Sequence, residues 1–203
     1  MALIKCPECS DNISDTAKTC VHCGFALVLS PMDKAFEALK VQVSHIPLKQ
    51  QSIFEQWLHT WSTYIGNERE FDPTRLRTYK RGEIVHLHLG YNVGSEEGGP
   101  RYAVVVENDN ARRSKVVVVV PLSTLENNQS KDSLHHSEVY LGKIIPGSDK
   151  ESYALPLHIR GISKMRIIKP RRDEHGVYKI SPEKLTEIDN KIKTLFTHKN
   201  HLT

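Results

Sequence analysis

Three features of the 203-residue sequence predict an α+β fold: a small, strongly bent β-barrel with a C-terminal helix, preceded by a helical segment and a small cysteine-rich unit. All four cysteines lie within the first 25 residues. Apolar residues then recur at helical spacing up to about residue 65, and from residue 79 short β-branched runs alternate with turn-forming residues. These changes of pattern divide the chain into residues 1–26, 27–72 and 73–203.

The cysteines form two CxxC pairs, Cys6 with Cys9 and Cys20 with Cys23, with ten residues between the pairs. Each pair can direct two thiolates at one tetrahedral ion, and about 25 residues bury too little apolar area to fold without such a ligand. We therefore expect one structural Zn²⁺ held by all four cysteines, in a reducing compartment. A redox-active CxxC is the less favoured alternative, and four sulfur ligands leave no open position for catalysis. The segment resembles the zinc ribbons that stand at the front of many bacterial proteins.

Two helices are expected before the strands, over residues 33–43 and 49–65. The second carries one broad apolar face, formed by Ile53, Phe54, Trp57, Leu58, Trp61, Tyr64 and Ile65. We expect this face to pack on the core or to dock on the domain that follows. A partner-binding surface is the alternative.

Short strands are expected over residues 83–89, 101–106, 115–120, 154–157 and 165–168. In the first of them Val85, Leu87 and Leu89 share one face, whereas His86 and His88 share the other and are expected on the solvent side. Five consecutive valines, 116–120, indicate a strand that is buried on both faces. The closing helix is expected to begin at the N-cap Ser181, with Pro182 as its first residue.

The formal net charge of +4 and the isoelectric point of about 8.8 permit a nucleic-acid partner without requiring one. No stretch approaches the roughly 18 apolar residues of a membrane-spanning helix. The first residues also lack the apolar region of a secretory signal. We therefore expect a cytoplasmic protein without a membrane partner.

Four motifs follow one another in the strand region. They are Lys80-Arg81-Gly82-Glu83-Ile84-Val85, the glycine-rich run Gly94-Ser95-Glu96-Glu97-Gly98-Gly99-Pro100-Arg101, the strand end Pro121-Leu122-Ser123-Thr124, and the segment Leu157-His158-Ile159-Arg160-Gly161-Ile162-Ser163-Lys164-Met165-Arg166. In this order and at this spacing, over roughly residues 79–195, the series resembles the PemK/MazF toxin family.

The resemblance implies an SH3-like barrel that forms a homodimer and acts as the toxin of a type II toxin–antitoxin pair. It implies a sequence-specific endoribonuclease that cleaves single-stranded RNA without a catalytic metal ion and leaves a 2′,3′-cyclic phosphate and a 5′-hydroxyl. Its partners would be single-stranded RNA and a separate antitoxin protein, since this sequence contains no acidic, disordered antitoxin-like tail.

By the same resemblance Arg101 and Ser123 occupy the catalytic positions, with Thr124 as the alternative to Ser123. The residue types suit the reaction, because a guanidinium can grip two phosphate oxygens and stabilise the charge that builds up as the 2′-hydroxyl attacks. Two residues depart from the family pattern: Tyr102 stands where a proline is usual, and Ser123 stands where a threonine is usual.

A glycine-rich loop lets backbone N–H groups approach a phosphate, so residues of this loop are expected to bind RNA: Glu96, Gly98 and Gly99. A stripe of basic residues is expected to follow the RNA backbone: Arg160, Lys164 and Arg166. A non-catalytic nucleic-acid-binding or regulatory protein on the same barrel is the competing hypothesis. A third is that the zinc ribbon is the functional part and the barrel only its scaffold.

Overall fold

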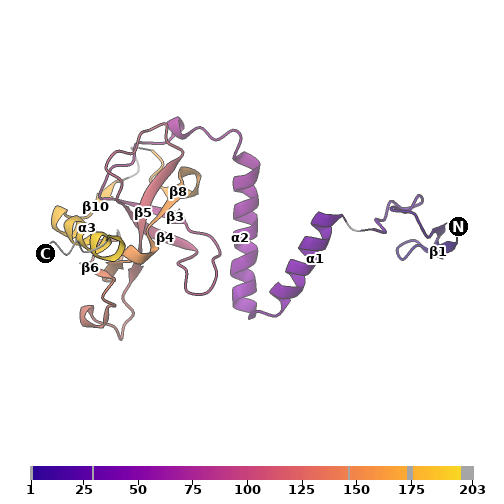
Figure 1. Ribbon diagram of the computed structural model, residues 1–203, viewed down its shortest axis with the longest axis horizontal. Helices are drawn as coiled ribbons and strands as arrows, with labels where there is room; N and C mark the ends of the chain where they lie inside the picture. The colour runs from indigo at the N-terminus through magenta and orange to yellow at the C-terminus, as the bar shows by residue number, and fades with distance from the viewer. Residues whose placement is uncertain (1, 29, 146, 173–175, 198–203) are drawn as a thin grey trace. The chain divides into compact units, whose positions relative to one another are not determined.

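The computed structural model describes residues 2–28, 30–145, 147–172 and 176–197 (Figure 1). The chain separates into two compact units, Met1–Ile53 and Phe54–Thr203. Among the described residues, no helix combines the length and the apolar character that crossing a bilayer requires.

The first unit contains a small β-hairpin and helix α1. Strand β1 (Leu3–Lys5) pairs antiparallel with β2 (Asn12–Ser14), and Ile13 packs with Cys6 and Cys20 in a small buried cluster. Helix α1 (Pro31–Ser44) starts at the N-cap Ser30, whose hydroxyl accepts from the backbone N–H of Asp33. The Asp33 carboxylate accepts from the Ser30 N–H in return, which completes a capping box.

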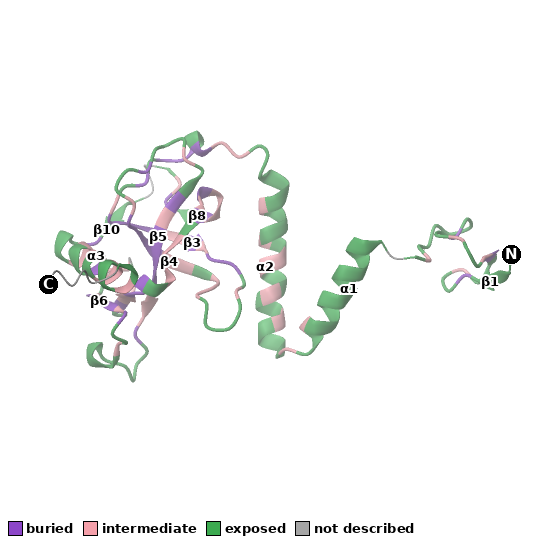
Figure 2. Ribbon diagram, in the orientation of Figure 1, coloured by how far each residue is buried: buried purple, intermediate pink, exposed green. Residues whose placement is uncertain are grey.

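Helix α2 (Leu48–Asn67) crosses the division between the two units, and from Phe54 onward it belongs to the second. No residue of α2 is fully buried, as Figure 2 shows. Its apolar face is nonetheless partnered in the second unit, because Phe54, Trp57 and Tyr64 contact aromatic residues of the sheet or its loops. The expected docking role of this face is therefore confirmed for these three residues, whereas Trp61 and Ile65 stay exposed.

The second unit contains an eight-stranded antiparallel sheet in the order β10-β3-β4-β5-β7-β6, with β8 paired to β5 and β9 to β3. Its strands are β3 (Glu83–His88), β4 (Pro100–Val105), β5 (Val116–Thr124), β6 (Val139–Gly142), β7 (Ser152–Ala154), β8 (Arg160–Ser163), β9 (Ile167–Lys169) and β10 (Tyr178–Lys179). Short 3₁₀ helices connect them, namely η1 (Pro73–Arg75), η2 (Lys131–Ser133), η3 (Pro156–His158) and η4 (Lys164–Arg166).

The sheet has a buried cluster on each face. Cluster one contains Val85, Leu87, Leu89, Ala103, Val105, Val117, Val119, Ile162 and Ile167, with Leu76 and Tyr79. Cluster two contains Ile84, Val104, Val106, Val120, Leu122, Val139, Leu141, Ala154, Ile180 and Ile188. The valine strand contributes to both, as expected, although its first residue Val116 is 47% exposed.

Helix α3 (Pro182–Phe196) covers cluster two with Ile188, which is fully buried. It begins as expected, since the hydroxyl of Ser181 accepts from the N–H of Lys184 and Pro182 occupies the first helical position. The α+β fold class predicted from the sequence is thus confirmed, with a bent antiparallel sheet, a C-terminal helix, preceding helices and a four-cysteine N-terminal hairpin.

Two of the predicted strands are wrong in their bounds. The run 154–157 is the end of β7 followed by η3, because Pro156 cannot donate a hydrogen bond to a strand partner. The run 165–168 is split between η4 and β9, and Ser163 caps that turn by accepting from the N–H of Met165.

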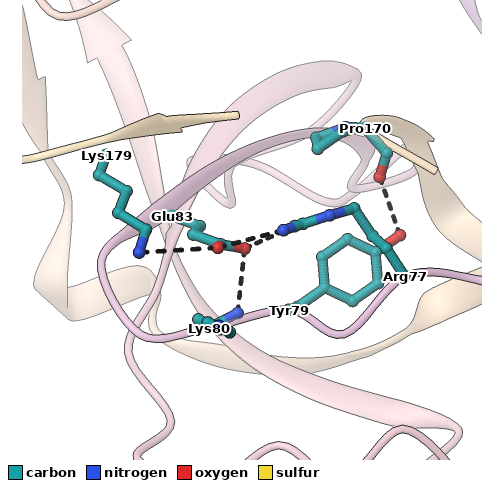
Figure 3. A network of polar contacts seen from close by, with 6 residues as sticks. All are labelled: Arg77, Tyr79, Lys80, Glu83, Pro170 and Lys179. Carbon is teal, nitrogen blue, oxygen red and sulfur yellow. Dashed lines mark hydrogen bonds and ion pairs between the residues drawn. The ribbon is translucent and has the colours of Figure 1, made fainter. Parts of the chain in front are cut away.

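Figure 3 shows an ion-pair network that anchors the start of β3. The carboxylate of Glu83 accepts from Nη1 and Nη2 of Arg77, at 2.5 and 3.2 Å, and from the backbone N–H of Lys80 at 3.0 Å. Both side chains of the pair are almost fully buried. Beside them the Tyr79 hydroxyl donates to the carbonyl of Pro170, and burial raises the pKa of Tyr79 to about 12. The acidic residue of the first motif, Glu83, therefore has a structural role.

Candidate functional site

The glycine-rich loop between β3 and β4 is closed at its base by backbone hydrogen bonds. Leu89 donates to the carbonyl of Gly99 at 2.9 Å, and Gly99 donates to the carbonyl of Gly90 at 2.7 Å. A β-carbon on Gly98 would lie 2.8 Å from the Gly90 carbonyl oxygen, so only glycine fits this close approach. The loop is therefore a shaped element that ends directly before Arg101.

Arg101 lies in β4 with its guanidinium turned back to this loop. Its Nε donates to the Gly98 carbonyl at 3.2 Å, and its Nη2 lies 3.1 Å from Oε2 of Glu97. The side chain of Arg101 is 39% exposed and that of Glu97 20% exposed. The arginine is thus oriented by a local ion pair but remains open to solvent.

Ser123 lies on the sheet face of Arg101, and Thr124 on the opposite face. Leu122 belongs to cluster two, so the alternation of side chains along β5 turns Ser123 toward cluster one. Ala103 of β4 belongs to cluster one, and Arg101 lies two residues before it, so Arg101 points to the same face. The register pairs Ala103 with Pro121, and if it continued by two residues it would set Arg101 opposite Ser123. The β4–β5 pairing ends at Ala103, however, and Ser123 itself pairs with Tyr153 of β7.

The predicted basic stripe separates into two kinds of residue. Arg166 donates from Nη1 to the Leu89 carbonyl at 3.0 Å, next to the base of the glycine-rich loop. Burial, and then the charge of Arg160, lower the pKa of Arg166. Arg160 is half-buried at the start of β8.

Lys164, in contrast, is fully buried. Its ammonium donates to the Ala111 carbonyl at 3.0 Å, and burial lowers its pKa. RNA has no access to the Lys164 side chain in the structure, so the expectation that this lysine follows the RNA backbone does not fit its burial. Among the loop residues predicted to bind RNA, Glu96 is exposed, and Gly98 and Gly99 are half-buried.

Two contributors to the site were missed in the sequence. Glu97 neighbours the predicted Glu96, and only the fold reveals that it is the partner of Arg101. Trp57 of α2 packs on the loop, because a β-carbon on Gly90 would lie 3.1 Å from its ring, and the Arg166 guanidinium lies 5.4 Å from the centre of that ring. The signal for Trp57 was the apolar face of α2, which indicated docking but not its target.

His88 fills the space between α2 and β3. Its ring centre lies 6.3 Å from that of Trp57 and 6.4 Å from that of Tyr64. Burial, then the charge of Arg166, lowers the pKa of His88, which favours the neutral imidazole. The expectation that His88 lies on the solvent side is therefore wrong, because α2 covers this part of the strand face.

The four cysteines of the first unit form a candidate metal centre. Their sulfur atoms all lie within 4.8 Å of one another, with 3.7 Å between Cys6 and Cys23 and 3.6 Å between Cys9 and Cys20. Four thiolates around one Zn²⁺ at about 2.3 Å lie roughly 3.8 Å apart in a tetrahedron. The donor set and spacing therefore fit a four-sulfur metal site.

The family model described as "PemK-like, MazF-like toxin of type II toxin-antitoxin system" matches residues 80–196, which is more than half of the chain. Among solved structures, the chain is similar to an endoribonuclease in complex with its cognate antitoxin from a mycobacterial species. The identity is 20%, the match covers 57% of this chain and 91% of that chain, and the TM-score is 0.38. It is also similar to MazF from Deinococcus radiodurans, with 18% identity, coverage of 59% of this chain and 96% of that chain, and a TM-score of 0.44.

Proposed function

Because the chain belongs to the PemK-like, MazF-like toxin family of type II toxin–antitoxin systems, we propose that it is a sequence-specific endoribonuclease that cleaves single-stranded RNA. Arg101 and Ser123 would act on the scissile phosphate. The single observation that carries this assignment is their position on one face of neighbouring strands, beside a loop in which glycine is sterically required.

In the proposed reaction the 2′-hydroxyl of the RNA attacks the adjacent phosphorus. The P–O2′ bond forms, the P–O5′ bond breaks, and the products carry a 2′,3′-cyclic phosphate and a 5′-hydroxyl. The 2′-hydroxyl proton passes to solvent, and the leaving 5′-oxygen takes a proton from water. Arg101 stabilises the phosphorus oxygens as their charge grows, and the Ser123 hydroxyl donates a hydrogen bond to the same group. Thr124 lies on the opposite face and is the weaker candidate.

The ion pair with Glu97 is compatible with this role. A guanidinium has five N–H donors, more than its contacts with Gly98 and Glu97 use. The partial exposure of Arg101 leaves the group within reach of a phosphate. We propose that Glu97 orients the guanidinium before RNA binds, and that Arg160 and Arg166 attract the RNA backbone from the other side of the loop.

The remaining parts of the proposal follow the family. The protein would act in the cytoplasm as a homodimer and would be neutralised by a separate antitoxin. The four cysteines would hold a structural Zn²⁺, whereas the cleavage itself would need no metal ion. These assignments rest on family membership and on the spacing of the sulfur atoms.

The test is to incubate the full-length protein with a long single-stranded RNA in the presence of EDTA and to identify the fragment ends by mass spectrometry. We expect discrete fragments with cyclic phosphate ends, and far fewer fragments from Arg101→Ala in the same time. RNA binding without cleavage by the unaltered protein would instead favour the non-catalytic binding protein. Both tryptophans, Trp57 and Trp61, lie in the second unit, so their fluorescence reports whether that unit stays folded in EDTA.

A further inference from the structure

A group of aromatic residues occupies the sheet face opposite to Arg101. Residues that pair directly across two strands share a face, and the register pairs His86 with Tyr102 of β4 and with Lys169 of β9. It also pairs Ile84 with Tyr178 of β10. The pairing therefore gathers three aromatic rings and one cation on a single face of β10, β3, β4 and β9.

These rings form a partly open surface. The rings of His86 and Tyr102 are stacked, with 4.7 Å between their centres and 27° between their planes. Tyr178 is 50% exposed, and Lys169 is exposed as well. An aromatic pair that faces inward would instead be covered by neighbouring side chains, as Tyr79 is.

The same face is hollowed. His86, Tyr102, Tyr178 and Lys169, together with Ile168 and Pro170, line a pocket of about 440 Å³. Pockets that bind small ligands typically measure about 300–1,000 Å³ and combine apolar walls with few polar groups. Burial, then the charge of Lys169, lowers the pKa of His86, so the neutral imidazole offers one donor and one acceptor.

We propose that this aromatic platform, defined as His86, Tyr102, Tyr178 and Lys169, binds a nucleobase of the RNA substrate next to the cleavage site. Aromatic side chains on an exposed sheet stack unpaired bases, and an adjacent cation attracts the phosphate of the same nucleotide. The proposal rests on the proposed function and extends it by a base-binding site.

The position of the platform favours RNA as its occupant. Tyr102 follows Arg101 directly, and the two side chains point to opposite faces of β4. Both lie at the first residues of the strand, where Pro100 is exposed, so an RNA strand that turns round this end contacts both. Tyr102 is also the residue that departs from the Arg-Pro pattern of the family, and the platform gives this departure a purpose.

The test measures binding of the full-length protein to a fluorescein-labelled, mixed-sequence 20-mer RNA that carries 2′-fluoro groups in place of the attacking hydroxyls. Fluorescence anisotropy gives the Kd at several salt concentrations. We expect Tyr102→Leu to weaken binding by about five- to 150-fold, the loss that corresponds to one stacked base, and Tyr178→Leu to act in the same direction. Tyr102→Phe keeps a stacking ring and is expected to rescue binding.

Tyr140→Leu is the matched control, because Tyr140 lies on β6 away from the platform. The salt dependence of the Kd distinguishes base stacking from contacts with phosphates. Tyr102→Leu should leave the slope of log K against log salt unchanged, whereas Lys169→Gln should reduce it by about one. Tyr178→Leu changes a half-exposed side chain, so it keeps the test decisive even if Tyr102→Leu fails to fold.

Values of Kd within twofold of the unaltered protein for both tyrosine variants would overturn the platform. If that protein still cleaves RNA, the proposed function stands without it. If the unaltered protein neither binds the probe nor cleaves RNA, the proposed function itself fails. A loss of self-association in Tyr102→Leu with unchanged RNA binding would assign the surface to a protein interface and also overturn the proposal.

Discussion

At the scale of single residues, the ion pair of Arg101 has two opposing effects. Its ion pair with Glu97 holds the side chain in place, but it also offsets part of the positive charge that would attract a phosphate. The partial exposure of the Arg101 side chain limits how much this pair contributes to stability. Its main effect should therefore appear in RNA binding.

Glu97→Gln is expected to strengthen binding of the 2′-fluoro RNA several-fold, because the charge of Arg101 becomes available to a phosphate. The slope of log K against log salt should become steeper by the amount that corresponds to about one additional phosphate contact. Glu96→Gln is the matched control, since it makes the same change in net charge at the neighbouring, exposed residue. Equal effects of the two variants on the slope of log K against log salt would contradict the assigned role of the ion pair.

Glu83 shows how a motif residue can serve the fold. Glu83→Gln removes the counter-charge of the buried Arg77 and is expected to destabilise the protein by roughly 3–5 kcal/mol, measured by urea unfolding. Glu187→Gln tests an exposed pair with Lys184 and should cost no more than about 1 kcal/mol. A small effect of Glu83→Gln would show that the network in Figure 3 contributes little to stability.

At the scale of elements, α2 supports the loop that carries the candidate site. The ring of Trp57 lies against Gly90. Phe54 packs edge-on against Tyr91, with 4.9 Å between the ring centres. Arg166 of η4 donates a hydrogen bond to the carbonyl of Leu89 at the base of the same loop. The helix thus stabilises the loop from outside, although no residue of α2 is fully buried.

Gly90→Ala tests this contact. Gly90 has φ +104°, where a side chain is strained, and the added carbon would press on the Trp57 ring. We expect a loss of about 1–3 kcal/mol in the free energy of unfolding. In the Trp57→Ala background the steric part should vanish and the backbone part should remain, so the two effects should be non-additive.

Gly66→Ala provides the control for the glycine substitution. Gly66 lies in α2 with nothing near its missing side chain, so alanine should raise helix stability by about 0.5–1 kcal/mol. Strict additivity of Gly90→Ala and Trp57→Ala would mean that the helix and the loop are not coupled.

The elements that could be predicted from the sequence are those with a long pattern of their own. Helix α3 has the N-cap Ser181 followed by Pro182, β3 has alternating apolar residues, and β5 has a β-branched run. The short strands β8 and β10 carry no such signal, because pairing with longer neighbours is what stabilises them. The same limit applies to site residues: the sequence shows the charge of Lys164 and Arg166, but only packing shows that one is buried and the other contacts the loop.

At the scale of the whole molecule, the chain combines two units with different sources of stability. The second has two apolar clusters, whereas the first buries little beyond Ile13 and two cysteines. The predicted boundaries at residues 26 and 72 stay a prediction. Because the two units are stabilised separately, loss of the metal should unfold the hairpin of the first unit and leave the second unit folded.

Cys6→Ser is expected to abolish binding of one zinc ion per chain and to unfold the hairpin, since a four-sulfur site loses its closed coordination. The thermal midpoint of the second unit, followed by tryptophan fluorescence, should not change. Metal content by elemental analysis and the melting curve together test this. A zinc-replete Cys6→Ser protein, or a large fall in that midpoint, would refute the local role.

The central claim is that Arg101 and Ser123 act on one phosphate, and a double-mutant cycle on RNA cleavage tests it most directly. We predict that Arg101→Ala and Ser123→Ala each lower kcat/KM, with Arg101→Ala costing about 10²–10³-fold, and that the double variant loses less than the product of the two effects. Full activity of Ser123→Ala, or cleavage by Arg101→Ala at the unaltered rate, would contradict the account.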